Sequence, residues 1–178
     1  MLIYLDNCCI QRPLDDRSQP RINLEAKAIE AVLELIKSGT VRLLSSQVNE
    51  VEIRNTPDSE RGRRIFAMGI VSLADMVATV SRAAYEGSEK IEPRCGEIEW
   101  RNKWERKEVD PSDKKEYKRC LDALHAAVAI EYHADYFCTA DKRLLKKLKA
   151  LRKRKSPDGG LLPYFVSPLE LAAEIISQ

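Results

Sequence analysis

Short, mainly apolar runs alternate with longer stretches of helical spacing, and this alternation restricts the fold more than any other feature of the chain. Four such runs are LIYL, VRLLS, YFCT and PYFV, at residues 2–5, 41–45, 136–139 and 163–166. None shows the strict apolar/polar alternation of a strand with one wet face, so we interpret them as strands buried on both faces of a parallel sheet. We therefore predict an α/β protein: a three-layer α/β/α open parallel sheet with helices on both faces.

Helical patterns fill the segments between these runs. We expect a helix from Asn23 to a stop at Gly39, because Gly is favoured just after helix ends. Other helices are expected at about residues 46–55, in the Arg-rich segment that follows, and at 74–85, 112–133, 142–155 and from 168 onward. A weaker strand is expected at GIVSL, residues 69–73.

Residues 87–117 differ from the rest of the chain. They are highly charged, contain few aliphatic side chains, and carry Trp100 and Trp104 at the i, i+4 spacing of one helix face. The full length of 178 residues suits one domain with a substantial core. We predict a single domain over residues 1–178, with 87–117 as an insertion that is part helix and part loop.

Amino-acid composition indicates where the protein resides in the cell more clearly than it indicates what the protein binds. The chain has 30 Lys and Arg against 28 Asp and Glu, so its formal net charge of +2 neither requires nor excludes nucleic acid. Its five cysteines are odd in number and form no CxxC pair, which argues against a disulfide framework and a thiolate zinc site. We find no signal-peptide pattern and no membrane span of about 20 apolar residues. We therefore expect a cytoplasmic protein without a membrane partner.

Acidic residues follow three of the expected strands. Asp6 ends the first run, Asp141 lies two residues beyond Thr139, and either Glu50 or Glu52 falls in the helix after the second run. In open parallel α/β sheets, ligands bind outside the carboxyl ends of the strands. We therefore expect these carboxylates at one edge of the sheet.

A fourth acid, Asp122, lies beside an apolar stripe in the otherwise uncharged segment CLDALHAAVAI. We expect it to be partly buried, and to join the other acids if its helix packs against the same edge. Clustered carboxylates raise one another's pKa values, and a hard divalent cation offsets that repulsion. Oxygen ligands of this kind suit magnesium or manganese, which can promote attack of water on a phosphodiester.

Four motifs resemble the signatures of the PIN domain family, in the family's order. They are YLDNCC, SSQVNEVEI, DALHAAVA and YFCTAD ahead of KRLL, and the resemblance spans the chain apart from about residues 87–117. It implies a metal-dependent endoribonuclease that hydrolyses RNA phosphodiester bonds with bound Mg²⁺ or Mn²⁺. The acidic quartet, catalytic and metal-binding, would be Asp6, Glu52, Asp122 and Asp141. Glu52 is preferred to Glu50 because it fits the family's spacing from Ser46 better.

Members of the PIN family include toxins of toxin-antitoxin pairs, so the resemblance also implies an antitoxin protein as partner and a homodimer. The chain departs from the family at one point. PIN domains usually carry Asn two residues after the first Asp, whereas here that position is Cys8 and Asn7 lies one step earlier. The alternative function is a catalytically inactive PIN-fold module that binds RNA or protein.

Each candidate residue also has an ordinary structural interpretation. Asp141 could cap the basic helix, a role that Asp often takes. Asp122 could belong to an ion pair, and Thr139 could be an ordinary strand-end residue. His125 is interpreted as a packed, hydrogen-bonded core residue and is left out of the catalytic set. The basic face of residues 142–155 could be solvated or could follow an RNA backbone.

Overall fold

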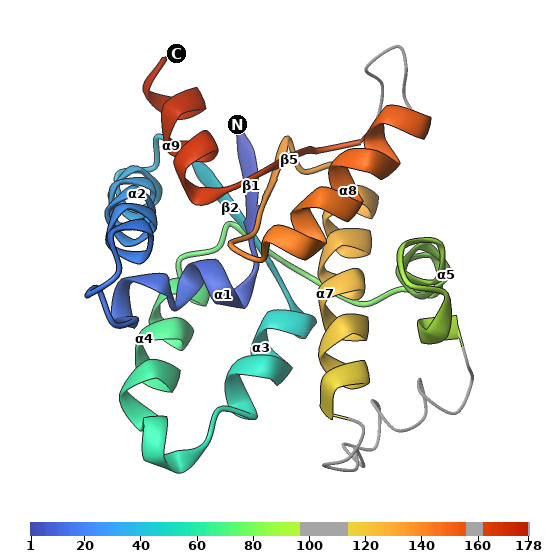
Figure 1. Cartoon of the computed structure of the whole chain (residues 1–178), viewed down its shortest axis with the longest axis horizontal. Helices are drawn as coiled ribbons and strands as arrows, with labels where there is room; N and C mark the ends of the chain where they lie inside the picture. Colours follow the sequence, from blue (N-terminus) through green and yellow to red (C-terminus); the bar gives the residue numbers. More distant parts are fainter. Residues whose placement is uncertain (97–113, 156–161, 178) are drawn as a thin grey trace.

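A five-stranded, all-parallel sheet forms the centre of the molecule (Figure 1). The computed structural model describes residues 1–96, 114–155 and 162–177, and the statements below refer to them. The strands are β1 (Leu2–Leu5), β2 (Arg42–Ser46), β3 (Met76–Ala78), β4 (Tyr136–Cys138) and β5 (Tyr164–Val166). Their order in the sheet is β3-β2-β1-β4-β5. The predicted α/β class with an open parallel sheet is confirmed.

Helices cover both faces of this sheet. They are α1 (Asn7–Ile10), α2 (Pro20–Lys37), α3 (Gln47–Arg54), α4 (Arg61–Val71), α5 (Arg82–Ile91), α7 (Lys114–Glu131), α8 (Lys142–Lys155) and α9 (Pro168–Ile176). Short 3₁₀ turns occur at Arg12–Leu14, Asp58–Glu60 and Pro93–Gly96. In Figure 1, α2 and α9 lie on one side of the strands, while α5, α7 and α8 lie on the other.

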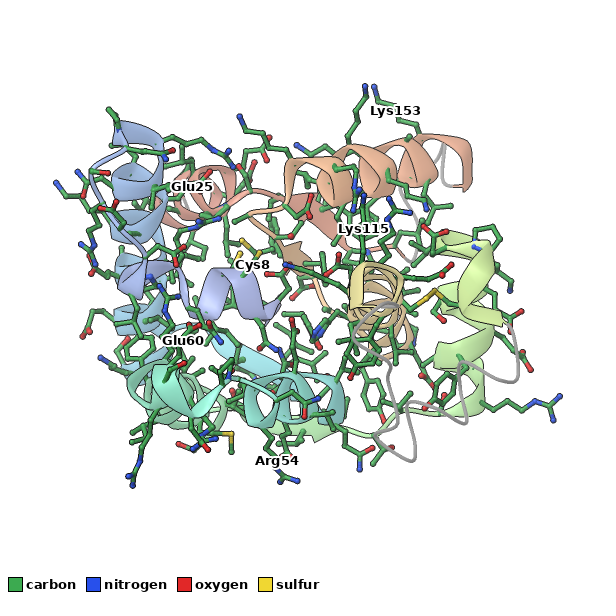
Figure 2. All side chains as sticks on the ribbon, turned by 60° about the horizontal axis from the view of Figure 1, so that its bottom comes forward. Cys8, Glu25, Arg54, Glu60, Lys115 and Lys153 are labelled. Atoms are coloured by element: carbon green, nitrogen blue, oxygen red, sulfur yellow. A yellow bond between two sulfur atoms is a disulfide. The ribbon has the colours of Figure 1, made fainter. Side chains whose placement is uncertain are left out.

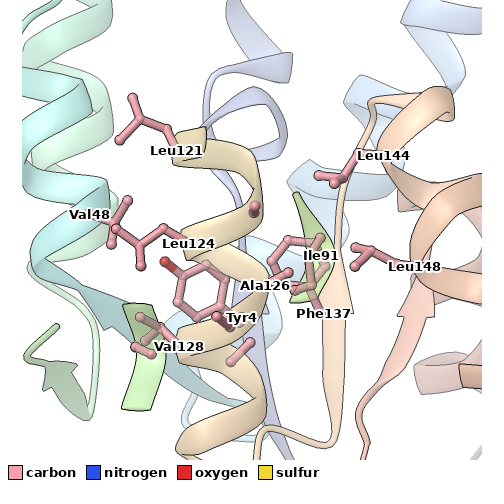
Figure 3. Close-up of a cluster of buried hydrophobic side chains, with 14 of the residues drawn as sticks. Tyr4, Val48, Ile91, Leu121, Leu124, Ala126, Val128, Phe137, Leu144 and Leu148 are labelled. Carbon is pink, nitrogen blue, oxygen red and sulfur yellow. The ribbon is translucent and has the colours of Figure 1, made fainter. Parts of the chain in front are cut away.

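Two apolar cores form because successive strand residues point to opposite faces. Tyr4, Leu44 and Phe137 belong to the core beneath α7, together with Leu124 and other side chains of that helix (Figure 3). Ile3, Leu5, Leu43 and Cys138 belong to the second core, beneath α2 and α9. Burial on both faces explains why the strand sequences lack polar alternation.

The strand order places a topological switch point between β1 and β4. The chain builds β1, β2 and β3 outward in one direction and then returns to the other side of β1 for β4 and β5. In the β1–β4 pair, Leu5 lies opposite Cys138, so both strands end at the same level. Asp6 and Thr139 therefore emerge next to each other, at the type of position where open α/β sheets bind ligands.

Three element boundaries differ from the sequence-based expectation. The strand expected at residues 69–73 is instead the end of α4, and β3 lies at Met76–Ala78. β3 is an edge strand of three residues, two of them exposed, so it leaves almost no apolar pattern to detect. The helix expected at 74–85 begins only after its cap, Ser81. Helix α2 begins at Pro20 rather than Asn23, because proline is well tolerated at the first helical position.

The expected insertion is only partly within the described residues. Residues 87–91 are the second half of α5, which packs against α7, so this part continues a core helix. The tryptophan pair at Trp100 and Trp104 lies outside the described residues. The assignment of 87–117 as an insertion in a single domain remains a prediction.

One disulfide corrects the expectation drawn from cysteine spacing. Cys95, after α5, and Cys120, in α7, are bonded to each other, visible as a yellow bond in Figure 2. Cys8, Cys9 and Cys138 are free. Spacing could not reveal the pair, because it depends on how α5 packs against α7. Among the described helices, none combines the length and apolar character needed to cross a membrane.

Candidate metal centre

One cavity of about 230 Å³ is lined by all four carboxylates of the expected quartet, and we call it the acidic cavity. Asp6 follows β1, Glu52 lies in α3, Asp122 lies in α7, and Asp141 precedes α8. Helix α7 therefore packs so that Asp122 joins the acids at the strand ends. Glu50 does not line this cavity and instead forms an ion pair with Arg54 at 3.3 Å.

Asp6 is held rigidly at the start of α1. Its Oδ1 accepts hydrogen bonds from the backbone N–H of Cys9 at 3.0 Å and from the Cys8 thiol at 2.8 Å. Its own backbone N–H donates to the Cys138 carbonyl at 3.1 Å, which ties it to β4. Burial raises the pKa of Asp6 above its ordinary value, and these hydrogen bonds offset only part of that rise. The group therefore suits a site that a cation would stabilise.

Asn7 connects the first acid to Glu52, although it lies one residue before the position at which the motif resemblance led us to expect Asn. Its Nδ2 donates to Glu52 Oε2 at 2.7 Å, and its Oδ1 accepts from Asn49 Nδ2 at 3.1 Å. Asn49 is in turn fixed by the backbone N–H of Ser46, at the start of α3. Sequence reasoning missed both amides. The S-x-x-N pattern from Ser46 to Asn49, a capping box in the structure, was the available signal.

His125 contacts Glu52 from the other side. Its Nε2 lies 3.0 Å from Glu52 Oε2, and its Nδ1 lies 2.5 Å from the Tyr4 hydroxyl. The side chain is 1% exposed, so the interpretation as a packed, hydrogen-bonded histidine is correct, but its link to Glu52 was missed. Burial raises the pKa of Glu52, yet the hydrogen bond and charge of His125, with the Asn7 hydrogen bond, bring it below its ordinary value. Glu52 is thereby kept ionised.

Asp122 is half-buried and makes no ion pair with any residue that the structure describes. Burial raises its pKa to about 7, and the negative charge of Asp6 adds to the rise. The charges of His125 and Lys118 act in the opposite direction and offset only part of it. Asp122 is thus a carboxylate whose ionised form the protein compensates only in part.

Asp141 has the capping role that its sequence position suggested, and it also lines the acidic cavity. Its Oδ1 accepts from the backbone N–H groups of Arg143 at 2.8 Å and Leu144 at 3.0 Å, at the start of α8. The Thr139 hydroxyl accepts from the Asp141 N–H at 3.1 Å and is fully buried. Asp141 Oδ2 makes no hydrogen bond with any residue that the structure describes. That oxygen is therefore available to a ligand.

The donor set fits a hard divalent cation better than a soft one. Within the described part of the chain, the one group whose ligand atoms all lie within 4.8 Å is Asp6, Cys8 and Cys9, so no three of the four carboxylates approach that closely. A hydrogen bond to Cys9, burial and the charge of Asp6 raise the pKa of Cys8, and burial raises that of Cys9, so both stay thiols. Thiols are poor metal ligands. The residues that could hold Mg²⁺ or Mn²⁺ are therefore the four carboxylates. A fifth, Asp15, also lines the cavity but is paired with Arg12 and Arg63.

In the presence of EDTA, the free energy of unfolding is expected to fall as pH rises from about 4 to about 7. The pKa of Asp122 is about 7 in the folded state against 3.8 ordinarily, so the folded protein keeps a proton that the unfolded chain releases. This contribution is complete below pH 3.8 and is lost as pH passes through 7. Asp122→Asn should flatten the slope, measured by urea unfolding at about pH 4.5 and about pH 7.5. An unchanged slope in the variant would refute this assignment.

Comparison with known proteins adds little to this geometry. No family model matches the chain, and no curated protein matches it. Among solved structures, one similar structure is that of VapBC2 from Rickettsia felis, bound to a DNA fragment from their promoter. The similarity covers 94% of this chain and 98% of that chain, with 13% identity and a TM-score of 0.46. At that level it supports no inference about this site.

Proposed function

We propose that this protein is a PIN-type endoribonuclease that hydrolyses RNA phosphodiester bonds with bound Mg²⁺ or Mn²⁺. The observation that carries the proposal is the convergence of Asp6, Glu52, Asp122 and Asp141 on one cavity at the switch point of the sheet. These acids are far apart in sequence, and two of them have raised pKa values. The resemblance of the four motifs to PIN signatures supports the same function.

The four carboxylates would share the reaction as follows. A divalent cation, when bound, would supply a water of lowered pKa and would balance negative charge on the phosphoryl group. Asp6, Asp122 and Asp141 would hold it, with Asp141 contributing the oxygen that does not cap α8. Glu52, kept ionised by Asn7 and His125, would bind the cation or orient the attacking water and accept its proton.

The biological setting is proposed from the motifs alone. A PIN-type toxin would have an antitoxin protein as partner, would act in the cytoplasm and could form a homodimer. Residues 87–117 would serve as an RNA-clamping arm, a partner surface or a dimer contact. The first of these roles predicts that deleting residues 97–113, a change that leaves α5, Cys95 and α7 in place, weakens RNA binding, and the other two predict that it changes partner binding or oligomer size.

A mixed, end-labelled RNA pool tests the proposal directly. The wild-type protein should cleave it with Mg²⁺ or Mn²⁺ and not with EDTA, and a matched single-stranded DNA shows whether RNA is preferred. Asp6→Asn, purified identically, should lose the metal-dependent cleavage, which excludes contaminating ribonuclease. If neither protein cleaves while both bind RNA or a protein partner, the chain is a non-catalytic binding module and the proposal is wrong.

A further inference from the structure

A second cavity, of about 200 Å³, adjoins the acidic cavity, and Asp122 lines both. We call it the basic cavity, because Arg119, Arg143 and Lys147 line it against Glu92 and Asp122. Arg119 precedes Asp122 by three residues on α7, so the two side chains lie on one helix face. Arg143 and Lys147 are four residues apart on α8 and likewise share a face. Two helices thus present three cations next to the candidate metal centre.

Two of the three cationic side chains that line the basic cavity have no ion-pair partner among the described residues. Lys147 forms an ion pair with Glu92 at 2.9 Å. The side chains of Arg119 and Arg143 make no hydrogen bond or ion pair with any residue that the structure describes. Asp122 does not neutralise them, because it forms no ion pair with either arginine. A guanidinium with free donors in a cavity is suited to bind an oxyanion.

The arginines that line the acidic cavity are different. Arg12 pairs with Asp15 at 2.7 Å and with Glu25 at 3.3 Å. Arg63 pairs with Asp15 at 2.9 Å and donates to the Leu14 carbonyl at 2.8 Å. Most of their donors are used within the protein, although Arg12 Nε makes only the ion pair with Glu25 and no hydrogen bond. Lys118 also lines the acidic cavity and pairs with no residue that the structure describes, so the free guanidinium donors next to the carboxylates are those of Arg119 and Arg143.

From this arrangement we propose that the basic cavity is a subsite for the backbone phosphate next to the one that is cleaved, with Arg119 and Arg143 as its ligands. This inference rests on the proposed function, because it places the scissile phosphate at the acidic cavity. Because Asp122 separates the two cavities, one RNA strand can place consecutive phosphates in them. The subsite favours a chain with a phosphate flanking the cut over a substrate with a single phosphodiester.

Salt-dependent binding tests the subsite without relying on cleavage. The affinity of the wild-type protein for a short, labelled single-stranded RNA is measured in EDTA by fluorescence anisotropy, between about 50 and about 200 mM salt. Arg119→Gln and Arg143→Gln should each weaken binding roughly 10-fold and reduce the slope of log K against log salt by about 0.7. Both side chains are unpaired, so thermal unfolding should be unchanged and a loss of fold can be recognised.

Lys153→Gln is the matched control. It removes one positive charge from the same helix, about 15 Å along its axis from Arg143, and its side chain lies on the outer side of α8 (Figure 2). This variant should bind RNA nearly as the wild type does. Equal losses in Lys153→Gln and Arg143→Gln would mean a diffuse basic surface and would overturn the subsite, as would unchanged RNA binding in both arginine variants.

The outcome separates this inference from the proposed function. If the wild type does not cleave RNA but the arginine variants lose RNA binding selectively, the endonuclease proposal fails and the phosphate subsite stands. If the wild type cleaves and the arginine variants bind and cleave normally, the subsite fails alone. An acidic protein partner that loses affinity for these variants while RNA does not would assign the cavity to protein binding instead.

Discussion

Glu52→Gln is expected to lower metal-dependent RNA cleavage at least about 100-fold, the lower end of the range for a positioned catalytic base. The carboxylate lines the acidic cavity, and its pKa is kept below the ordinary value by His125 and Asn7. Gln has nearly the same shape, and its amide can still accept the Asn7 hydrogen bond. The fold should therefore survive, and the loss should appear in initial cleavage rates at saturating Mg²⁺ or Mn²⁺.

Glu50→Gln is the matched control, because Glu50 lies two residues away in the same helix and has the same chemistry. Its carboxylate pairs with Arg54 on the surface of α3, and such pairs contribute little. Its cleavage rate should stay within about 2-fold of wild type, since surface substitutions of this kind are nearly neutral. If Glu50→Gln were the inactive variant, the assignment of Glu52 to the site would be wrong.

Leu124→Ala is expected to lower the free energy of unfolding by about 2–5 kcal/mol. Leu124 is fully buried in α7 and belongs to the same core as Tyr4 and Val48 (Figure 3). Truncation removes buried apolar surface and leaves a cavity that the helix cannot close, because the flanking layers are fixed by other contacts. Urea unfolding followed by circular dichroism gives the difference.

The control for this prediction uses the same substitution in an exposed helix. Leu24 lies in α2 and is 53% exposed. Leu24→Ala should change the free energy of unfolding by no more than about 0.5 kcal/mol. If the two variants were equally destabilised, Leu124 would not be part of the packed core between α7 and the sheet.

The fold class could be predicted from the sequence because it depends on local patterns of apolar residues. Strands such as β1 and β4 are buried on both faces, so they are uniformly apolar, and the helices between them repeat at their own period. The prediction was wrong at β3, because three residues of an edge strand, two of them exposed, form too short an apolar run to be recognised. It also failed for the Cys95–Cys120 pair, because the approach of α5 to α7 leaves no trace in cysteine spacing.

For the candidate site, the positions that depend on strand ends could be predicted from the residues alone. Asp6 and Asp141 follow β1 and β4, and parallel strands bring their carboxyl ends to one edge. The choice of Glu52 over Glu50 could only be favoured by spacing, since two residues of a helix differ in direction by more than half a turn. The orientation of α3, held by Asn7 and Asn49, decides which of them points into the cavity.

The remaining parts of the site depend on how the helices pack. Asp122 joins the other acids because α7 packs across the edge of the sheet, and His125 reaches Glu52 from the same helix. The free guanidinium groups of Arg119 and Arg143 line one cavity only because the fold brings α7 and α8 to it from different parts of the chain. Hydrophobic periodicity can be read within a short segment of sequence. The meeting of these side chains in one cavity depends on how helices that are distant in sequence pack together, and no local sequence pattern predicts that packing.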